Sequence, residues 1–324
     1  MKLKDLLRVK KIKDFLFLLW KTVRAFIREN AMNHSAALSY YTVFALPAIL
    51  IVLISLIGYF WGEKDIEQQM LSEFSKLMGQ EGASQVKFML DKVRSDSSHT
   101  ATLAGVVMLL FSSTVVFYTL QHSLNALWKI SDDIRHGFIK YMIDKFLSFT
   151  FILSFAFLLA VSLVLQAFIA WMDHYFGAVM QGHLQSAAAD PSLLQQALRY
   201  LNEIYTHYFS SVFFIVEFLI ALGLNTFLFA CIFKFLPDAK VKWKIAIPGG
   251  ILTALLFEAG QKLIGWKLGH TDFTSSYGPA GAMIIVFVWI FYSSMIIFFG
   301  GIFVQLYGAH IGEPVKAIPG HKHH

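Results

Sequence analysis

Long apolar runs separated by short polar segments dominate the pattern of this 324-residue chain. A helix needs roughly 20 apolar residues to cross the hydrocarbon core of a bilayer. Six runs reach about that length. Four of them cover residues 36–61, 101–127, 146–171 and 209–235, and the last two lie within Ile245–Gly308. The pattern predicts an all-α, polytopic membrane protein with six transmembrane helices.

The segments between and before these runs predict two further helical features. In residues 1–35, apolar side chains recur at helical spacing beside basic ones, which is typical of an amphipathic helix lying in the membrane interface. Residues 62–100 are polar, with Gly79 and Gly82 between two helical patterns, and predict a helical hairpin outside the bilayer. The apolar side of the first helix comprises Ile12, Phe15, Leu16, Leu19, Val23, Phe26 and Ile27.

The basic residues are distributed unevenly, and this sets the expected orientation. Nine Lys and Arg residues lie in the N-terminal arm, and four lie in each of the second and fourth loops, whereas the third and fifth loops hold one each. The first loop holds five, but it is long and has seven acids, and long loops count for less. Short cytoplasmic loops carry an excess of Lys and Arg, so both termini are expected in the cytoplasm. The expected organisation is an arm at 1–35, a membrane domain at 36–310 with external loops at 62–100, 173–208 and 267–278, and a cytoplasmic tail at 311–324.

Polar side chains inside two of the apolar runs form the candidate site. Glu217 and Asn225 lie in the fourth run, and Glu258, Gln261 and Lys262 lie in the fifth. An ionisable group inside a membrane helix costs several kcal/mol and is a functional hypothesis by default. Counted along their helices, the two acids fall at similar depth, so Glu217 could face Glu258 or Lys262.

Two interpretations of these residues stay open at this stage. In the structural one, Glu258 pairs with Lys262 one turn away and Glu217 is protonated or hydrogen-bonded between helices. In the functional one, the residues line a polar cavity for a substrate headgroup or a proton. Lys262 could also extend to the interface, which would weaken both interpretations.

Proline and glycine mark the candidate hinge and turn. Pro47 lies inside the first run, where it frees a backbone carbonyl and bends a helix, either for packing or as a hinge. Tyr277, Gly278 and Pro279 close the turn before the last run, and Pro suits the first position of a helix. Small residues near Gly249 and Gly300 favour close helix packing.

The remaining composition narrows the chemistry. Hydrophobic residues make up 56% of the chain, and its net charge of +6 follows from the basic loops rather than from a nucleic-acid partner. The single cysteine and the scattered histidines give no metal-ligand spacing, and no phosphate-binding glycine loop or nucleophile elbow is present. We therefore expect no enzyme, no cofactor and no bound metal.

Several short motifs, taken in order, resemble one known family. They are Ala36-Ala37-Leu38-Ser39-Tyr40-Tyr41 with Pro47, Asn125-Ala126-Leu127-Trp128, Phe235-Leu236-Pro237, Trp243 with Pro248-Gly249-Gly250, and Tyr277-Gly278-Pro279-Ala280-Gly281 with Trp289 and Gly300-Gly301. Together they resemble the YihY/BrkB family of bacterial inner-membrane proteins over residues 20 to 310. The acid often found after the last of these glycines is absent here, since Ile302-Phe303 follows.

The resemblance implies six helices in the bacterial cytoplasmic (inner) membrane and provides no catalytic residues. It implies transport, or handling of lipids or envelope components, and the polar residues within the apolar runs predict that this occurs through a polar intramembrane cavity. The expected partners are membrane lipids and a lipid or polar small-molecule substrate. The alternative is a non-transporting scaffold that binds envelope-assembly partners, while the ribonuclease label once given to the family is disfavoured because the cytoplasmic loops are short and poor in acids.

Overall fold

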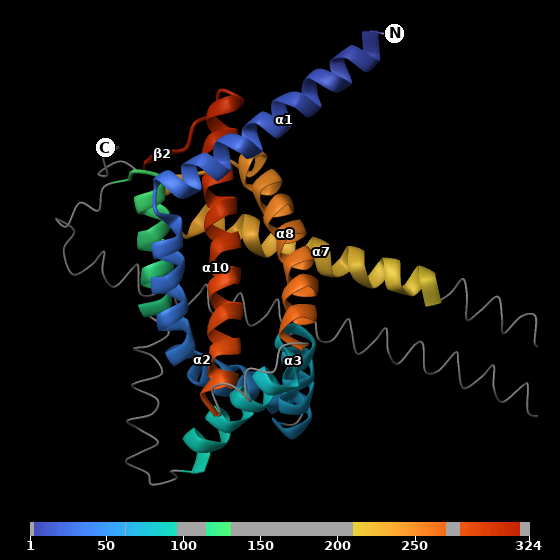
Figure 1. Cartoon of the computed structure of the whole chain (residues 1–324), viewed down its shortest axis with the longest axis vertical. Coiled ribbons are helices and arrows are strands. Elements are labelled where there is room, and N and C mark those ends of the chain that lie inside the picture. Colours follow the sequence, from blue (N-terminus) through green and yellow to red (C-terminus); the bar gives the residue numbers. More distant parts are fainter. Residues whose placement is uncertain (1–2, 62, 96–114, 131–209, 270–278, 318–324) are drawn as a thin grey trace, which may run out of the picture. The chain divides into compact units, whose positions relative to one another are not determined.

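The computed structural model describes residues 3–61, 63–95, 115–130, 210–269 and 279–317, which are mostly helical. Figure 1 shows the helices and strands. The chain divides into two compact units, one comprising Met1–Phe151 with Thr226–His324 and the other Ile152–Asn225. The helices are α1 (Leu3–Arg28), α2 (Ala31–Trp61), α3 (Glu63–Ser95), α7 (Ser210–Phe235), α8 (Trp243–Gly269) and α10 (Pro279–His310). A further helical segment covers residues 115–127.

The last helix, α10, is the centre of the first unit. It packs against α1, α2, α3 and α8. Its buried side chains are almost all apolar, and Phe298 and Val304 are fully enclosed. A helix that is apolar over most of its circumference and central in its unit is buried by its neighbours rather than by one stripe of contacts.

Two helices within the described part of the chain are long and apolar enough to cross a membrane. They cover Phe218–Phe235 in α7 and Met283–His310 in α10. The predicted spans at 101–127 and 146–171, and the turn between the last two spans, lie partly or wholly outside the described ranges. The prediction of six spans therefore stays a prediction.

The amphipathic helix predicted at the N-terminus is present as α1, and it has a packed side that the sequence pattern did not indicate. Leu18, Thr22 and Ala25 are buried, and the Thr22 hydroxyl donates to the Leu18 carbonyl at 2.9 Å. Most of the side predicted to be apolar, including Leu16 and Ile27, is exposed. The helix therefore has one side against α10 and a separate apolar side that none of the described residues buries.

The helical pair predicted at residues 62–100 appears in α3. Gly79 interrupts the helix with φ 81° and ψ 169°, a conformation that glycine adopts without steric cost. The segment packs against α2, α8 and α10. It therefore belongs to the packed body of the first unit, and its position outside the bilayer stays a prediction.

Two short strands bring the C-terminal segment to the turn before α8. Strand β1 (Ala239–Lys240) pairs antiparallel with β2 (Lys316–Ala317). The Glu313 carboxylate lies 3.3 Å from the Lys242 ammonium and 3.7 Å from that of Lys244. Segments that the charge pattern assigns to one side of the membrane therefore meet at one end of the first unit.

Candidate functional site

The predicted polar residues of α8 lie beside the packed side of that helix. Glu258 and Gln261 are half-buried, and Lys262 is exposed. Spacings of three and four residues place Glu258 and Lys262 on the same side of α8 as the exposed Leu255. We call Glu258, Gln261 and Lys262 the polar stripe; it lies next to the exposed apolar residues of the same helix.

The opposite side of α8 is in close contact with its neighbours. A Cβ atom at Gly250 would lie 2.5 Å from the Thr226 carbonyl oxygen and 3.0 Å from the Ala230 nitrogen, both in α7. At Gly260 it would overlap the Tyr292 ring of α10. Glycine at these positions permits close approach of the helices; the sequence predicted this for Gly250 but did not indicate Gly260.

The other two candidate residues lie in the first part of α7, which belongs to the second unit, whereas α7 from Thr226 onward belongs to the first unit. Asn225 is half-buried, whereas the side chain of Glu217 lies outside the described part of the structure. The predicted pairing of Glu217 with Glu258 or Lys262 concerns residues of different units. It stays a prediction.

The candidate hinge and turn residues are only partly covered. Pro47 is half-buried inside α2, which continues as a helix through it to Trp61. Pro279 is the first residue of α10, the position that the sequence predicted for it. Tyr277 and Gly278 lie outside the described residues.

A second polar cluster, which the sequence reasoning did not identify as a site, joins residues 115–130 to the turn after α7. The Asn125 amide nitrogen donates to the Asp238 carboxylate at 2.8 Å, and the Asp238 backbone N–H donates to the Asn125 side-chain oxygen at 2.9 Å. Gln121 donates to the same carboxylate at 3.3 Å. We call Asn125, Gln121 and Asp238 the polar clasp.

Trp128 extends this connection to α10. It is fully buried, and its indole N–H donates to the Gly301 carbonyl oxygen at 2.9 Å. The Gln305 amide donates to the Trp128 carbonyl oxygen at 3.2 Å. Buried polar groups need such partners, so the side chain of Trp128 fixes the end of segment 115–127 against the C-terminal third of α10.

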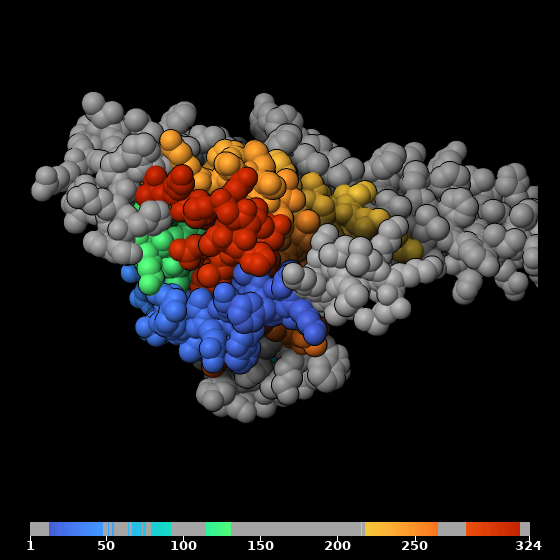
Figure 2. Space-filling view, turned by 90° about the horizontal axis from the view of Figure 1, so that it is seen from above, coloured from blue at the N-terminus to red at the C-terminus, as the bar shows by residue number. Residues whose placement is uncertain are grey.

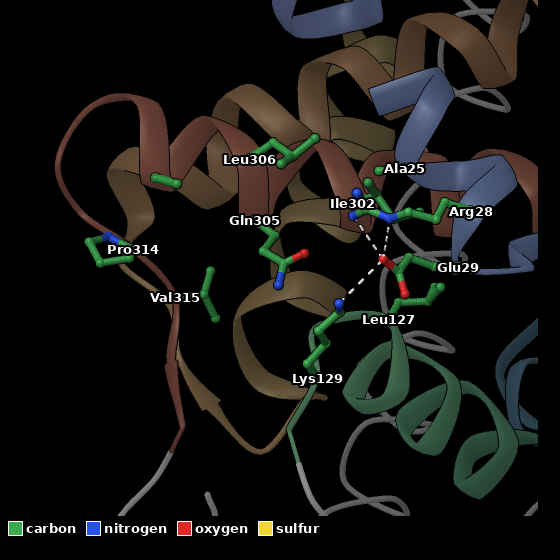
Figure 3. Close-up of a pocket in the computed structure, with 11 residues that line it drawn as sticks. Ala25, Arg28, Glu29, Leu127, Lys129, Ile302, Gln305, Leu306, Pro314 and Val315 are labelled. Carbon is green, nitrogen blue, oxygen red and sulfur yellow. Dashed lines mark hydrogen bonds and ion pairs between the residues drawn. The ribbon is translucent and has the colours of Figure 1, made fainter. Parts of the chain in front are cut away.

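A pocket of about 290 Å³, lined in part by Leu127 and Lys129 on either side of Trp128 in the sequence, lies at the same end of the unit. Figure 3 shows that α1, the end of segment 115–127, α10 and the strand-bearing C-terminal segment contribute to it. Arg28, Glu29 and Lys129 form an ion cluster beside apolar walls. In Figure 2, viewed from this end, α1, α10 and the segment containing Lys129 adjoin.

Metal ions in proteins are held by groups of His, Cys, Asp or Glu side chains. Across the five described ranges of the chain, no group of three such side chains is arranged to hold a metal ion. The ion cluster contains one carboxylate and two cations, which suits anions rather than metal cations.

Sequence patterns did contain a signal for the polar clasp. Asn125, Trp128 and Pro237 belong to the motifs that carried the family resemblance, and Asp238 follows directly. The spacing of 113 residues between Asn125 and Asp238 gave no reason to pair them. Only the packed helices bring them together.

Two long apolar helices and the exposed apolar side chains of the described residues are typical of a helical membrane protein. A model of the family described as virulence factor BrkB matches residues 22–317. The chain therefore belongs to the virulence factor BrkB family.

The curated relatives are also described as membrane proteins. A UPF0761 membrane protein of Alkalilimnicola ehrlichii is 24% identical over 86% of this chain and 56% of its own length. That of Saccharophagus degradans is 24% identical over 93% of this chain and 63% of its own. A UPF0761 membrane protein of Pseudomonas aeruginosa is 26% identical over 86% of this chain and 60% of its own length. The chain thus spans less than two thirds of these relatives, and no solved structure matches it.

Proposed function

We propose that this protein transports or handles a lipid or another envelope component through a polar path inside the bacterial cytoplasmic membrane. The observation that carries the proposal is the polar stripe on α8, where the half-buried Glu258 precedes Lys262 by one turn. Ionisable groups within a membrane helix are costly and usually mark substrate or ion pathways. In this proposal, Glu217 and Asn225 on α7 and Gln261 on α8 complete the path.

Several side-chain and backbone contacts hold one end of the first unit together, which supports entry of the substrate from elsewhere. The polar clasp, the Trp128–Gly301 bond and the pairing of β1 with β2 all tie together the end of the first unit that carries the basic segments. We assign this end to the cytoplasmic side, by the positive-inside rule. A substrate would then enter from the opposite side or laterally from the bilayer, and Pro47 would permit the opening.

The experiment is a paired neutralisation of the two acids. Glu217→Gln and Glu258→Gln, separately and together, are expected to abolish movement of a fluorescent phospholipid or rescue of the envelope defect of a deletion strain. Ala259→Ser, an exposed position next to Glu258, is the matched control. Activity that survives the double substitution at normal membrane abundance contradicts the proposal.

The orientation and span count have their own test. Reporter domains fused after the C-terminus and within residues 173–208 should give opposite signals, cytoplasmic for the first and external for the second. Two cytoplasmic signals would contradict the six-span arrangement with both termini inside.

A scaffold is the second candidate function, and α3 favours it. Its Phe88 side chain is 60% exposed beside Lys87, on a segment that otherwise packs on α2, α8 and α10. Deleting α3 would disturb that packing, so substitution of the exposed residues is the cleaner test. Phe88→Ser with Lys87→Ser should remove function if a partner binds there and leave it unchanged if the polar stripe carries the activity.

A further inference from the structure

The pocket at the clasped end has apolar walls and a charged rim. Leu127, Ile302, Leu306 and Val315 contribute apolar walls, and Gln305 adds an amide (Figure 3). Its volume of about 290 Å³ lies at the lower end of the range for small-molecule sites. A headgroup-sized molecule fits this space.

The rim carries one net positive charge. A single oxygen of Glu29, Oε1, accepts from Arg28 Nε at 2.9 Å, lies 2.9 Å from Arg28 Nη2 and is 3.5 Å from Lys129 Nζ. The side chains of Arg28 and Lys129 are 74% and 52% exposed, against 21% for Glu29. The half-buried Glu29 carboxylate therefore positions both cations, whose side chains remain largely accessible to solvent.

The backbone of Lys129 gives an independent reason to assign its side chain a role. It has φ 58°, in the left-handed region that glycine favours. The Ile130 N–H donates to the Asn125 carbonyl oxygen at 2.9 Å and the Lys129 N–H to that of Ala126 at 3.0 Å, the two bonds of a Schellman helix ending. Glycine is the usual residue at this position, so a lysine here bears a conformational cost. Such outliers concentrate at functional sites.

We propose that this pocket binds a phosphodiester group, as carried by anionic phospholipid headgroups and by soluble glycerophosphodiesters. Arginine forms two parallel hydrogen bonds with phosphate oxygens, and lysine binds phosphate as a point charge. A phosphodiester has a single negative charge, which cancels the net charge of Arg28, Glu29 and Lys129. The apolar walls accept the glycerol carbons.

The charge balance distinguishes this ligand from two related ones. A phosphomonoester, close to a dianion at neutral pH, would leave excess negative charge beside Glu29. A phosphocholine headgroup adds a cation beside Arg28 and Lys129 and gains no net attraction. This site is separate from the polar stripe on α8, so it can bind its ligand whether or not the protein transports anything.

Calorimetric titration of the full chain in an uncharged detergent tests the assignment. The probes are dihexanoylphosphatidylglycerol, dihexanoylphosphatidylcholine and glycerophosphoglycerol. Arg28→Gln and Lys129→Gly are expected to weaken binding of the first probe at least about tenfold, because each removes a charge-assisted contact. Lys129→Gly is also expected to keep or raise the melting temperature, since glycine suits the backbone there.

Arg24→Gln is the matched control, since Arg24 lies one helical turn before Arg28 on α1 and does not line the pocket. It should leave the dissociation constant within about twofold, a few tenths of a kcal/mol. Binding of glycerophosphoglycerol as tight as that of the lipid identifies a soluble source, and binding of the lipid alone identifies a headgroup. Equal loss in all three variants, no loss in any, or no binding by the unsubstituted protein overturns the proposal.

Discussion

Asn125 and Asp238 bond to each other twice, side chain to side chain at 2.8 Å and backbone to side chain at 2.9 Å, across 113 positions of sequence. An asparagine has both a donor and an acceptor, so it can satisfy the carboxylate and the backbone N–H of one residue together. Gln121 shares the same carboxylate. This reciprocal pair directly connects segment 115–127 to the turn before α8.

Loss of this pair should destabilise the fold. Asn125→Ala removes both bonds and leaves the Asp238 carboxylate with only the Gln121 contact in the polar clasp. A bond to a charged group is worth about 1.5–3 kcal/mol, and we expect a loss of about that size. The melting temperature in detergent, monitored by intrinsic fluorescence, measures it. Ala126→Ser, at the exposed neighbouring position, should change little; equal melting temperatures for all three proteins would contradict the role of the clasp.

Close packing of α8 on α7 predicts contrasting effects of one substitution at two glycines. Gly250→Ala places a methyl group 2.5 Å from the Thr226 carbonyl oxygen, and backbone cannot rotate away. Overpacking of this kind costs about 1–3 kcal/mol. At Gly223 a Cβ atom meets nothing within 4 Å, so Gly223→Ala should be neutral or stabilising by up to about 1 kcal/mol. Melting temperatures of the two variants and the unsubstituted protein measure this difference. Equal melting temperatures for the two variants would contradict the prediction.

The indole bond of Trp128 can be separated from its packing. Trp128→Phe removes the N–H that donates to Gly301 while keeping most of the ring, and we expect a loss of about 1 kcal/mol. Trp128→Ala also empties a fully buried site and should cost about 3–5 kcal/mol. Trp20→Phe is the control, because Trp20 is exposed on α1. A Phe variant as unstable as the Ala variant would show that the hydrogen bond dominates.

His34, which precedes the first predicted span, should make stability depend on pH. Burial, with a smaller contribution from the nearby His122, lowers the pKa of His34 below its ordinary value. Between that lowered pKa and about 6.5, the unfolded chain binds the proton and the folded chain does not, so stability falls as pH falls below about 6.5 and is flat above it.

The difference between two proteins isolates this effect from other titrating groups. His34→Gln should lose the part of the pH dependence below about pH 6.5 while keeping a hydrogen-bond partner for Ser123, which now contacts His34 Nδ1 at 3.1 Å. His310→Gln, at the exposed end of α10, should keep it. Melting temperatures from pH 5 to 8 measure both, and parallel curves for the unsubstituted protein and His34→Gln would contradict the assignment.

Local sequence patterns predicted where helices begin and break, but they did not predict which side of a helix is buried. The break at Gly79 followed from its position between two helical patterns, and the start of α10 at Pro279 followed from the preference of proline for that position. On α1 the apolar periodicity indicated the side bearing Leu16 and Ile27, whereas the buried side centres on Leu18 and Ala25. A helix with two apolar sides gives one averaged pattern, and the partner that covers one of them is not encoded locally.

The sequence by itself determined that this protein is helical and membrane-embedded, because the length and apolarity of a run decide whether a helix can cross a bilayer. It also determined the family, through motifs such as Asn125-Ala126-Leu127-Trp128. The tertiary structure decided what those motifs do: they join Asn125 to Asp238 and Trp128 to Gly301. It also decided that Arg28, Glu29 and Lys129 meet beside a pocket. Contacts over a hundred residues depend on helix packing, which no local spacing specifies.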